Sequence, residues 1–406
     1  MNVVFLSPAY PLEMQDYVRG LAEVGANVIG VAEGPVSMLP NKVKKYLSDY
    51  IQVPQLFDEQ GVAAAVVQYS KKHHIDRVES LWEPLTLTAA TIRERLNIPG
   101  MSRETVLGFR DKSIMKDRIA KAGLRVPYAF RCKSSQEIEA AVEQIGFPVI
   151  IKPIAGAGSA DTHRVDTPSQ LQRVIKQVRH VQEVSTEEFI DGREFTYDTV
   201  CINGIPHYEN VAEYLPRPLI ARSNEWISPI IITIKDLNSP YIRQGIKLGH
   251  GVLKALNMGT GFTHMEWYLT PKGEVVFGEI GCRPGGAHLV DQMNFTSDID
   301  LFREWARSVC WQDMHIQNPR LYNCAIIFKR AMGQGVIQRI NGLDTFMHKY
   351  GRSVMVEKLL RPGVRRRNWK QTLVSDGFII LRHHNWITAK HLAEKAATDI
   401  QIFANE

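Results

Sequence analysis

Two glutamates in the third quarter of the chain are predicted to face each other across a β-hairpin. They lie in the stretch HMEWYLTPKGEVVFGEIGCRPGG, residues 264–286, where two apolar runs flank a polar turn. This pattern predicts a β-hairpin with residues 271–274 as its loop. The predicted register pairs Thr270 with Val275, Tyr268 with Phe277 and Glu266 with Glu279.

Facing carboxylates on neighbouring strands repel each other, so their placement needs an explanation. A divalent cation between them would supply one, because Mg²⁺ takes one or two protein carboxylates and completes its shell with water and phosphate oxygens. A salt-bridge cluster in which Arg283, Lys272 or another cation neutralises the pair explains the hairpin equally well.

A second candidate motif is FPVIIKPIAGAGSADTHRV, residues 147–165. Lys152 closes a strongly apolar strand, where a charge is costly unless it has a partner. Gly156, Gly158 and Ser159 follow, and their flexible backbone could wrap a phosphate with N–H groups. A surface lysine before an ordinary turn is the simpler alternative. The motif lacks the GK[ST] ending of a P-loop and leads into a strand.

A third motif, TEEFIDGREFTYDTV, is acidic. It is interpreted as a strand end, a turn at Asp191-Gly192 and a second strand that starts at Glu194. Carboxylates accept two hydrogen bonds and commonly bind ribose hydroxyls. Taken alone, however, the stretch is only an acidic hairpin.

Several elements must position these side chains. Residues 1–100 alternate strand-like and helix-like segments, which predicts a small parallel sheet covered by helices. The first turn, SPAYP, lacks the glycine fingerprint of dinucleotide-binding folds, so this Rossmann-like domain is not expected to bind a dinucleotide. Residues 101–185 and 186–318 carry mixed helices and antiparallel strands. Residues 216–240 are predicted to be a long irregular connection, a feature that is usually functional. Residues 319–406 form a mixed α/β C-terminal extension.

The order of the motifs resembles the ATP-grasp superfamily over about residues 105–315. A helix-borne lysine in RDK comes first, then the strand lysine with its glycine loop, the acidic hairpin and the two glutamates. The resemblance implies a fold of classes α/β and α+β, in which two subdomains clamp ATP between them. A Rossmann-like domain precedes these subdomains, and a C-terminal extension follows them.

The resemblance also implies a role for each motif residue. ATP would bind at the phosphate-contacting Lys112 and Lys152, the lid residues Gly156, Gly158 and Ser159, the adenine-binding segment Glu187, Glu188 and Ile190, and the ribose-binding Glu194. Glu266 and Glu279 would bind magnesium, with manganese as an alternative, and Arg283 would meet the transferred phosphoryl group or the acyl-phosphate.

Within the superfamily, the whole chain looks most like the carboxylate–amine ligases, in which a THxE stretch such as Thr263-His264-Met265-Glu266 recurs. These enzymes activate an acid as an acyl-phosphate and join it to an amine, or in related members to a thiol, with release of ADP and phosphate. One departure is Gly281, where many members place an asparagine as a further metal ligand. Alternatives are a carboxylase-type or kinase-like enzyme and a non-catalytic nucleotide sensor.

Four further side chains are candidates for contacts with the acid or the amine. His264 lies two residues before Glu266 on a strand, so both side chains face the same side. Glu83 in WEPL follows a predicted strand at the carboxyl edge of the sheet, where ligands often bind, and could hold an amine. Arg217 and Arg222 lie in the long connection and could bind the carboxylate of the acceptor.

The composition limits the remaining classes. The formal net charge of +6 over 406 residues is too small and too dispersed to indicate nucleic acid binding. The basic run in residues 361–370 is interpreted as a solvated loop. Five scattered cysteines without metal-ligand spacing favour a reducing compartment, and we expect neither a signal peptide nor a membrane span. We expect a cytoplasmic enzyme, with a homodimer as one option.

Overall fold

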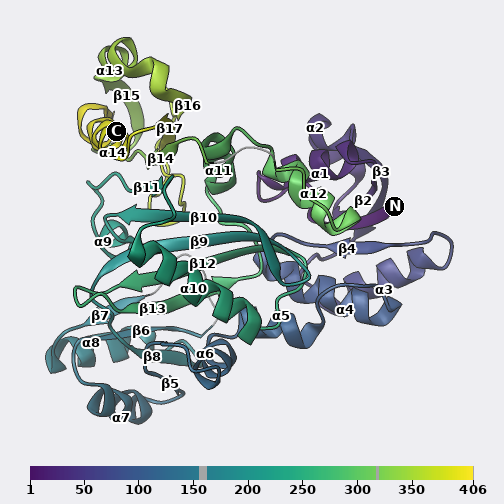
Figure 1. The fold of residues 1–406 in the computed structure, drawn as a ribbon, viewed down its shortest axis with the longest axis horizontal. Helices are drawn as coiled ribbons and strands as arrows, with labels where there is room; N and C mark the ends of the chain where they lie inside the picture. Colours follow the sequence, from purple (N-terminus) through teal and green to yellow (C-terminus); the bar gives the residue numbers. More distant parts are fainter. Residues whose placement is uncertain (155–161, 317–319, 406) are drawn as a thin grey trace.

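The computed structural model describes residues 1–154, 162–316 and 320–405 of the chain. The N-terminal part forms the predicted parallel sheet, with strand order β3-β2-β1-β4 and helices packed against it (Figure 1). The buried pattern of β1, in which four of five residues are inaccessible, is what a parallel strand covered on both faces requires. The elements are β1 (Asn2–Leu6), α1 (Met14–Glu23), β2 (Asn27–Glu33), η1 (Val36–Met38), α2 (Asn41–Lys44), β3 (Leu47–Val53), α3 (Glu59–Ser70), β4 (Arg77–Glu79), η2 (Glu83–Leu85) and α4 (Thr86–Leu96).

A smaller four-stranded sheet, of order β5-β8-β6-β7, follows after two helices. It has its own apolar core, and its helices α7 and α8 lie at the lower left of Figure 1. Each helix begins at a capping side chain: Ser134 accepts from the Glu137 N–H, and Thr167 accepts from the Gln170 N–H. The elements are α5 (Arg103–Arg110), α6 (Lys112–Lys121), β5 (Ala129–Cys132), α7 (Ser135–Ile145), β6 (Val149–Pro153), β7 (His163–Val165), α8 (Pro168–Val178) and β8 (Val184–Glu188).

The largest sheet has eight strands in the order β13-β12-β9-β10-β11-β14-β17-β16, and every neighbouring pair is antiparallel. Strand β9 is buried at nine of its ten residues, as expected for a strand inside a sheet covered on both faces. The elements are β9 (Arg193–Ile202), β10 (Ile205–Leu215), α9 (Pro218–Ser223), β11 (Ile230–Thr233), α10 (Pro240–Ala255), β12 (Gly261–Leu269), β13 (Val275–Gly281), α11 (Leu289–Ser297) and α12 (Leu301–Trp311).

The C-terminal part both extends this sheet and adds a two-stranded one, β15-β18. Strand β14 of the expected C-terminal extension pairs with β11 of the preceding part. Strand β8 contains residues on both sides of the expected boundary between residues 185 and 186. The division of the chain into four domains remains a prediction. In the basic run, Arg366 is buried and pairs with Glu225 at 2.8 Å, so the expected solvated loop is wrong at that residue. The elements are β14 (Asn323–Phe328), β15 (Val336–Asn341), α13 (Leu343–Tyr350), η3 (Gly351–Ser353), β16 (Val354–Leu359), β17 (Gly377–His383), α14 (Trp386–Asp399) and β18 (Gln401–Asn405).

The predicted long irregular connection at residues 216–240 is wrong. It contains the short helix α9 and strand β11, which is fully buried between β10 and β14 in the central sheet. Its apolar sequence PIIITI is the signal of a buried strand that the sequence analysis did not use. This segment therefore contributes a strand to the central sheet.

Helix α10 approaches the central sheet closely because two glycines face it. A Cβ added at Gly245 would lie 2.3 Å from the Trp267 ring, and one at Gly249 would lie 2.3 Å from the Tyr197 ring. The spacing of four residues puts both glycines on one face of the helix. Helix α10 is therefore packed closely against strands β12 and β9, which carry the candidate site.

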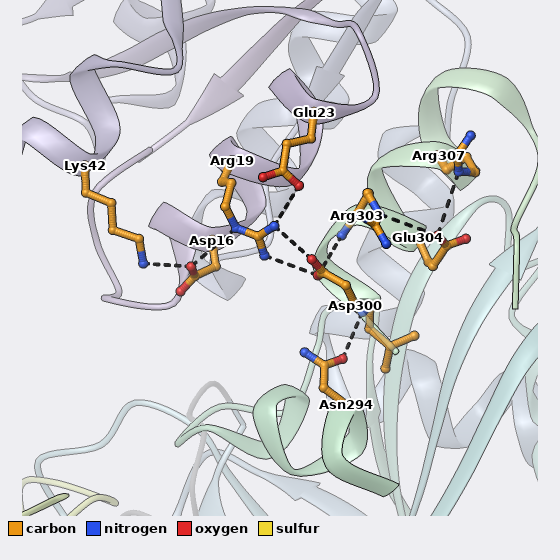
Figure 2. A network of polar contacts seen from close by, with 10 residues as sticks. Asp16, Arg19, Glu23, Lys42, Asn294, Asp300, Arg303, Glu304 and Arg307 are labelled. Carbon is orange, nitrogen blue, oxygen red and sulfur yellow. Dashed lines mark hydrogen bonds and ion pairs between the residues drawn. The ribbon is translucent and has the colours of Figure 1, made fainter. Parts of the chain in front are cut away.

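The N-terminal sheet is joined to the central sheet through helices α1 and α12. Figure 2 shows Arg19 of α1 reaching Asp300, which caps α12, at 2.8 Å. A Cβ at Gly20 would lie 2.4 Å from the Phe302 carbonyl oxygen, so the two helix backbones nearly touch. These contacts hold α1 of the N-terminal part against α12.

Candidate functional site

The hairpin β12–β13 places Glu266 directly opposite Glu279, as predicted. The register nearer the loop was predicted wrongly: Leu269 pairs with Val275, Tyr268 with Val276 and Trp267 with Phe277. A bulge accounts for the difference, because Gly278 is an extra residue that restores the pairing of the glutamates. A Cβ at Gly278 would lie 2.8 Å from the Glu266 carbonyl oxygen, so this close approach favours glycine.

The two carboxylates remain partly open to solvent, with side-chain exposures of 29% for Glu266 and 34% for Glu279. Lys112, the first residue of α6, lies 3.0 Å from Glu279 Oε1, and Tyr214 Oη donates to Glu266 Oε1 at 3.1 Å. The cation beside the pair is therefore Lys112, and the expected alternative partner Arg283 is bound to another carboxylate.

The donor set fits magnesium. Within the described parts of the chain, no group of three or more His, Cys, Asp or Glu side chains could hold a metal by itself. Two hard carboxylates on one face leave most of the coordination shell to water and phosphate, as Mg²⁺ prefers. Gly281, the expected departure, lies opposite His264 in the register, so a third protein ligand is not supplied there.

Lysines from two elements converge on a second, buried carboxylate. Lys152 at the end of β6 lies 3.0 Å from Glu187, and Lys116 of α6 lies 2.5 Å from it. Burial alone would raise the pKa of Glu187, but the two lysines outweigh this effect and hold it well below its usual range. Burial lowers the pKa of Lys116 to about 8, whereas Glu187 and Glu279 overcome burial and raise the pKa of Lys152.

Lys116 was missed by the sequence analysis. It follows Lys112 by four residues on one helix, so both side chains lie on the same face. Asp111 caps this helix by accepting from the Ser113 and Ile114 N–H groups. The spacing of the two lysines after a capping aspartate was the available signal.

The acidic stretch does not form the predicted hairpin, because β8 belongs to the small sheet and β9 to the central one. Residues 189–192 therefore connect two sheets. Glu188 is held by Arg125 at 2.7 Å, and its carboxylate also accepts from the Tyr128 N–H.

Glu194 is buried beyond this connection. Arg217 lies 3.2 Å from its carboxylate and also donates to the Ile190 carbonyl oxygen. Arg217 therefore links the connection at residues 189–192 to Glu194 of β9. Burial, together with the nearby charge of Glu266, raises the pKa of Glu194 to about 8. Arg222, the other arginine of this segment, donates to the Lys370 carbonyl oxygen and lies away from this pair.

His264 faces the same side as Glu266, as predicted, with 4.0 Å between its Nε2 and Glu266 Oε1. Its Nδ1 is 2.5 Å from Asp198, a fully buried side chain of β9 that also accepts from Thr196 and Asn210. Asp198 fixes the orientation of the imidazole ring. It was missed because FTYDTV looks like an ordinary strand, and only the pairing of β9 with β12 brings the two side chains together.

The remaining predicted residues fall into two groups. Glu83 and Arg283 meet each other at 2.8 Å between Glu83 Oε2 and Arg283 Nε. The expected lid residues Gly156, Gly158 and Ser159 lie outside the described residues.

Comparisons with known proteins agree on one superfamily. Residues 22–100 match the ATP-grasp N-terminal domain, and residues 111–194 match the ATP binding domain of the carbamoyl-phosphate synthase L chain. The L-arginine-specific L-amino acid ligase of Bacillus subtilis is 24% identical over 77% of this chain and 76% of its own length. The D-alanine–D-alanine ligase of Oceanobacillus iheyensis is 29% identical over 47% of this chain and 54% of its own.

Solved structures share the fold over nearly the whole chain. The L-amino acid ligase of Bacillus licheniformis superimposes with a TM-score of 0.79 at 20% identity, covering 99% of this chain and 98% of that one. The N5-carboxyaminoimidazole ribonucleotide synthetase of Thermotoga maritima gives a TM-score of 0.72 at 17% identity, with 99% of both chains covered. Among the described residues, none of the helices is long and apolar enough to cross a membrane.

Proposed function

Because the chain belongs to the ATP-grasp superfamily, we propose that it is an ADP-forming carboxylate–amine ligase. The proposal is that it activates a small carboxylic acid or amino acid as an acyl-phosphate and joins it to an amine. The observation that carries it is the convergence of Lys112 and Lys152 on the carboxylates at the junction of two sheets. The ligases named among its relatives support the amide-forming branch.

In this mechanism, an oxygen of the acid attacks the γ-phosphorus of ATP, and the bond to the ADP oxygen breaks. The amine nitrogen then attacks the acyl carbon, phosphate leaves with the electron pair of the C–O bond, and the nitrogen gives up a proton. Lys112 and Lys152 offset the negative charge of the phosphates, and Arg283 meets the acyl-phosphate.

Glu266 and Glu279 would hold magnesium, which supplies charge neutralisation at the phosphate oxygens when bound. Lys112 lies 3.0 Å from Glu279, so a phosphate bound to the metal would lie next to this lysine. The ribose would be bound by Glu194, and the backbone between Glu187 and Ile190 would face the adenine.

The proposed ligase activity is tested by a substrate screen that measures ADP release for pairs of acids and amines. The product is identified by mass spectrometry. The proposal expects ADP and phosphate only when both members of a pair are present, together with an amide whose mass equals the sum of the two minus water. ADP release with bicarbonate alone would favour a carboxylase-type enzyme, and nucleotide binding without turnover for any pair would favour a sensor.

We also propose that the protein works in the cytoplasm, a reducing compartment. This proposal is supported by the five cysteines, all of which are buried and unpaired in disulfides. Light scattering of the purified chain will decide between a monomer and the proposed homodimer.

A further inference from the structure

Three aromatic side chains meet at the carboxyl edge of the N-terminal parallel sheet. Tyr10 follows β1, Phe57 follows β3 and Trp82 follows β4. The ring centroids of Tyr10 and Trp82 are 4.9 Å apart and those of Phe57 and Trp82 are 5.3 Å apart, both in edge-to-face geometry. We call these three rings the aromatic cluster. Strands β3 and β4 are the outer strands of the sheet, so the connections that follow them bend toward each other over its edge.

Two rings of the aromatic cluster are mostly exposed to solvent. Tyr10 is 62% exposed and Phe57 is 64% exposed, although both contact Trp82. Leu12 and Met38, in the connections after β1 and β2, are exposed to a similar degree. Rings that bury so little of their own area add little to the core. Large apolar side chains gathered in water at one edge of a sheet mark a binding site.

The connection that carries Tyr10 is held in place by hydrogen bonds at both of its ends. Ser7 Oγ donates to the Tyr10 carbonyl oxygen. Near the other end, a carboxylate oxygen of Glu13 accepts from the His288 N–H at 3.3 Å. His288 belongs to the segment between β13 and α11, which also carries Arg283. The aromatic cluster is therefore tied to the segment that leaves the metal-site hairpin.

Trp82 is joined to the same segment through its neighbour Glu83. Glu83 Oε2 accepts from Arg283 Nε at 2.8 Å, and the other oxygen of this carboxylate accepts from Arg110 Nη1. These bonds fix the backbone beside Trp82 relative to Arg283, which meets the acyl-phosphate in the proposed function.

The segment at residues 283–288 also packs against the candidate site. A Cβ added at Gly285 would lie 3.1 Å from His264 Nδ1, and His264 Nε2 lies 4.0 Å from Glu266 Oε1. This segment therefore contacts both the proposed reaction centre and the connections that carry the aromatic cluster. An acid whose carboxyl group reacts there can extend its other end toward the three rings, at the edge where ligands of open α/β sheets bind.

We propose that the aromatic cluster binds the apolar side chain of the acid that is activated. The enzyme then prefers acids with an aryl ring or a large alkyl group over small acids. This inference rests on the proposed ligase function and names the class of its acid substrate. An aryl group fits the cluster because aromatic pairs favour the edge-to-face geometry that the three rings already adopt, and because its burial removes apolar surface from water.

The first experiment measures binding by calorimetry in the full-length chain with a non-hydrolysable ATP analogue. The probes are two pairs of acids, L-phenylalanine with L-alanine and 3-phenylpropionate with propionate. The members of each pair differ by one phenyl group. In at least one pair, the phenyl member should bind about 10- to 100-fold more tightly, the range expected for burying an aromatic ring. Equal affinities within both pairs, or no binding of any probe, would overturn the proposal.

The second experiment repeats these titrations with the double variant Tyr10→Ser, Phe57→Ser. The preference for the phenyl member should fall below about threefold. Ile387→Ser is the matched control, because Ile387 is 76% exposed and lies on α14, at the opposite side of the molecule in Figure 1. The control should keep the full preference. Thermal unfolding should match the wild type in both variants, because the replaced side chains are mostly exposed. A double variant that keeps the full preference would overturn the proposal.

A second copy of the chain is the competing occupant of the aromatic cluster. Light scattering of the wild type and the double variant tests it, and the two should have the same mass. A dimeric wild type with a monomeric double variant whose phenyl preference is unchanged would make the aromatic cluster a subunit interface and would overturn the proposal.

Steady-state kinetics separate this inference from the proposed function. With the same amine, kcat/KM for a phenyl acid should exceed that of its methyl counterpart by about 10- to 100-fold, because tighter binding raises kcat/KM. Amide formation with equal kcat/KM for both acids would overturn the aromatic site and keep the ligase. A phenyl preference in binding that depends on Tyr10 and Phe57, without any amide formed, would support the aromatic site and contradict the ligase.

Discussion

Two carboxylate sites lie within the same region but differ in how their charge is balanced. Glu187 is 4% exposed and lies between Lys116 and Lys152, so it is saturated by protein cations. Glu266 and Glu279 are about a third exposed and face each other, and one lysine, Lys112, pairs with Glu279. In the first arrangement, a buried carboxylate, Glu187, is an anchor that holds two lysines. In the second, two carboxylates share one paired lysine, so a cation from solution can bind to the excess negative charge. The substitutions below test this difference, from the largest expected effect to the smallest.

The anchor is tested by Glu187→Gln. This change leaves two buried ammonium groups without a counter-ion, so the free energy of unfolding should fall by about 3–5 kcal/mol. Urea denaturation measures the change. Glu183→Gln is the matched control, because Glu183 pairs with Arg131 and Lys133 at the surface and should leave the midpoint nearly unchanged. Equal midpoints for wild type and Glu187→Gln would show that Glu187 is not an anchor.

The open site is tested by Glu279→Gln. Turnover should fall by about 100- to 1,000-fold, the effect of removing one preorganised group around a transferring phosphoryl. Thermal unfolding should stay within a degree or two of the wild type, because the side chain is partly exposed. Glu274→Gln in the loop of the same hairpin, half exposed and paired with Arg125, is the control that should retain activity. Near-normal turnover of Glu279→Gln would refute the metal assignment.

The geometry of the open site is tested by Gly278→Ala. The added Cβ must move away from the Glu266 carbonyl oxygen, so the free energy of unfolding should fall by about 1–3 kcal/mol. Because the bulge sets the pairing of the glutamates, turnover should fall more than stability explains. A stable variant with full turnover would mean that the bulge does not position them.

The pH dependence of stability distinguishes Glu194 from its neighbours. Its folded-state pKa of about 8 lies above the ordinary glutamate pKa of 4.5, so the folded state binds more protons than the unfolded state between these values. Its contribution is therefore complete below pH 4.5 and is lost as pH rises through 8. Glu194→Gln should flatten the decline of unfolding free energy between pH 5 and 8, measured by urea denaturation at each pH. An unchanged slope would contradict the raised pKa.

Residue types and local patterns were enough to predict part of the fold and site. The parallel sheet, the helix-borne Lys112, the strand lysine and the opposition of Glu266 to Glu279 all follow from periodicity, turn signals and family resemblance. The residues that were missed depend on pairing between distant segments. Asp198 meets His264 only because β9 pairs with β12, and Arg110 meets Glu83 only because α5 packs beside the parallel sheet.

Errors of register and topology have equally local causes. The bulge at Gly278 shifts the pairing by one residue, a change that no periodic pattern encodes. The acidic stretch was interpreted as a hairpin because a strand–turn–strand pattern does not reveal that its two strands join different sheets. The apolar run at β11 was overlooked because prolines and charges surround it.

The central claim is that Glu266 and Glu279 bind a divalent cation together with the phosphates of ATP. The most direct measurement is electron paramagnetic resonance of Mn²⁺ added to the chain with a non-hydrolysable ATP analogue. In the wild type, the signal of free Mn²⁺ should be replaced by that of bound Mn²⁺ at equimolar metal. The affinity for Mn²⁺ should be at least tenfold weaker in Glu279→Gln and unchanged in Glu274→Gln. Equal Mn²⁺ binding by wild type and Glu279→Gln would contradict the account.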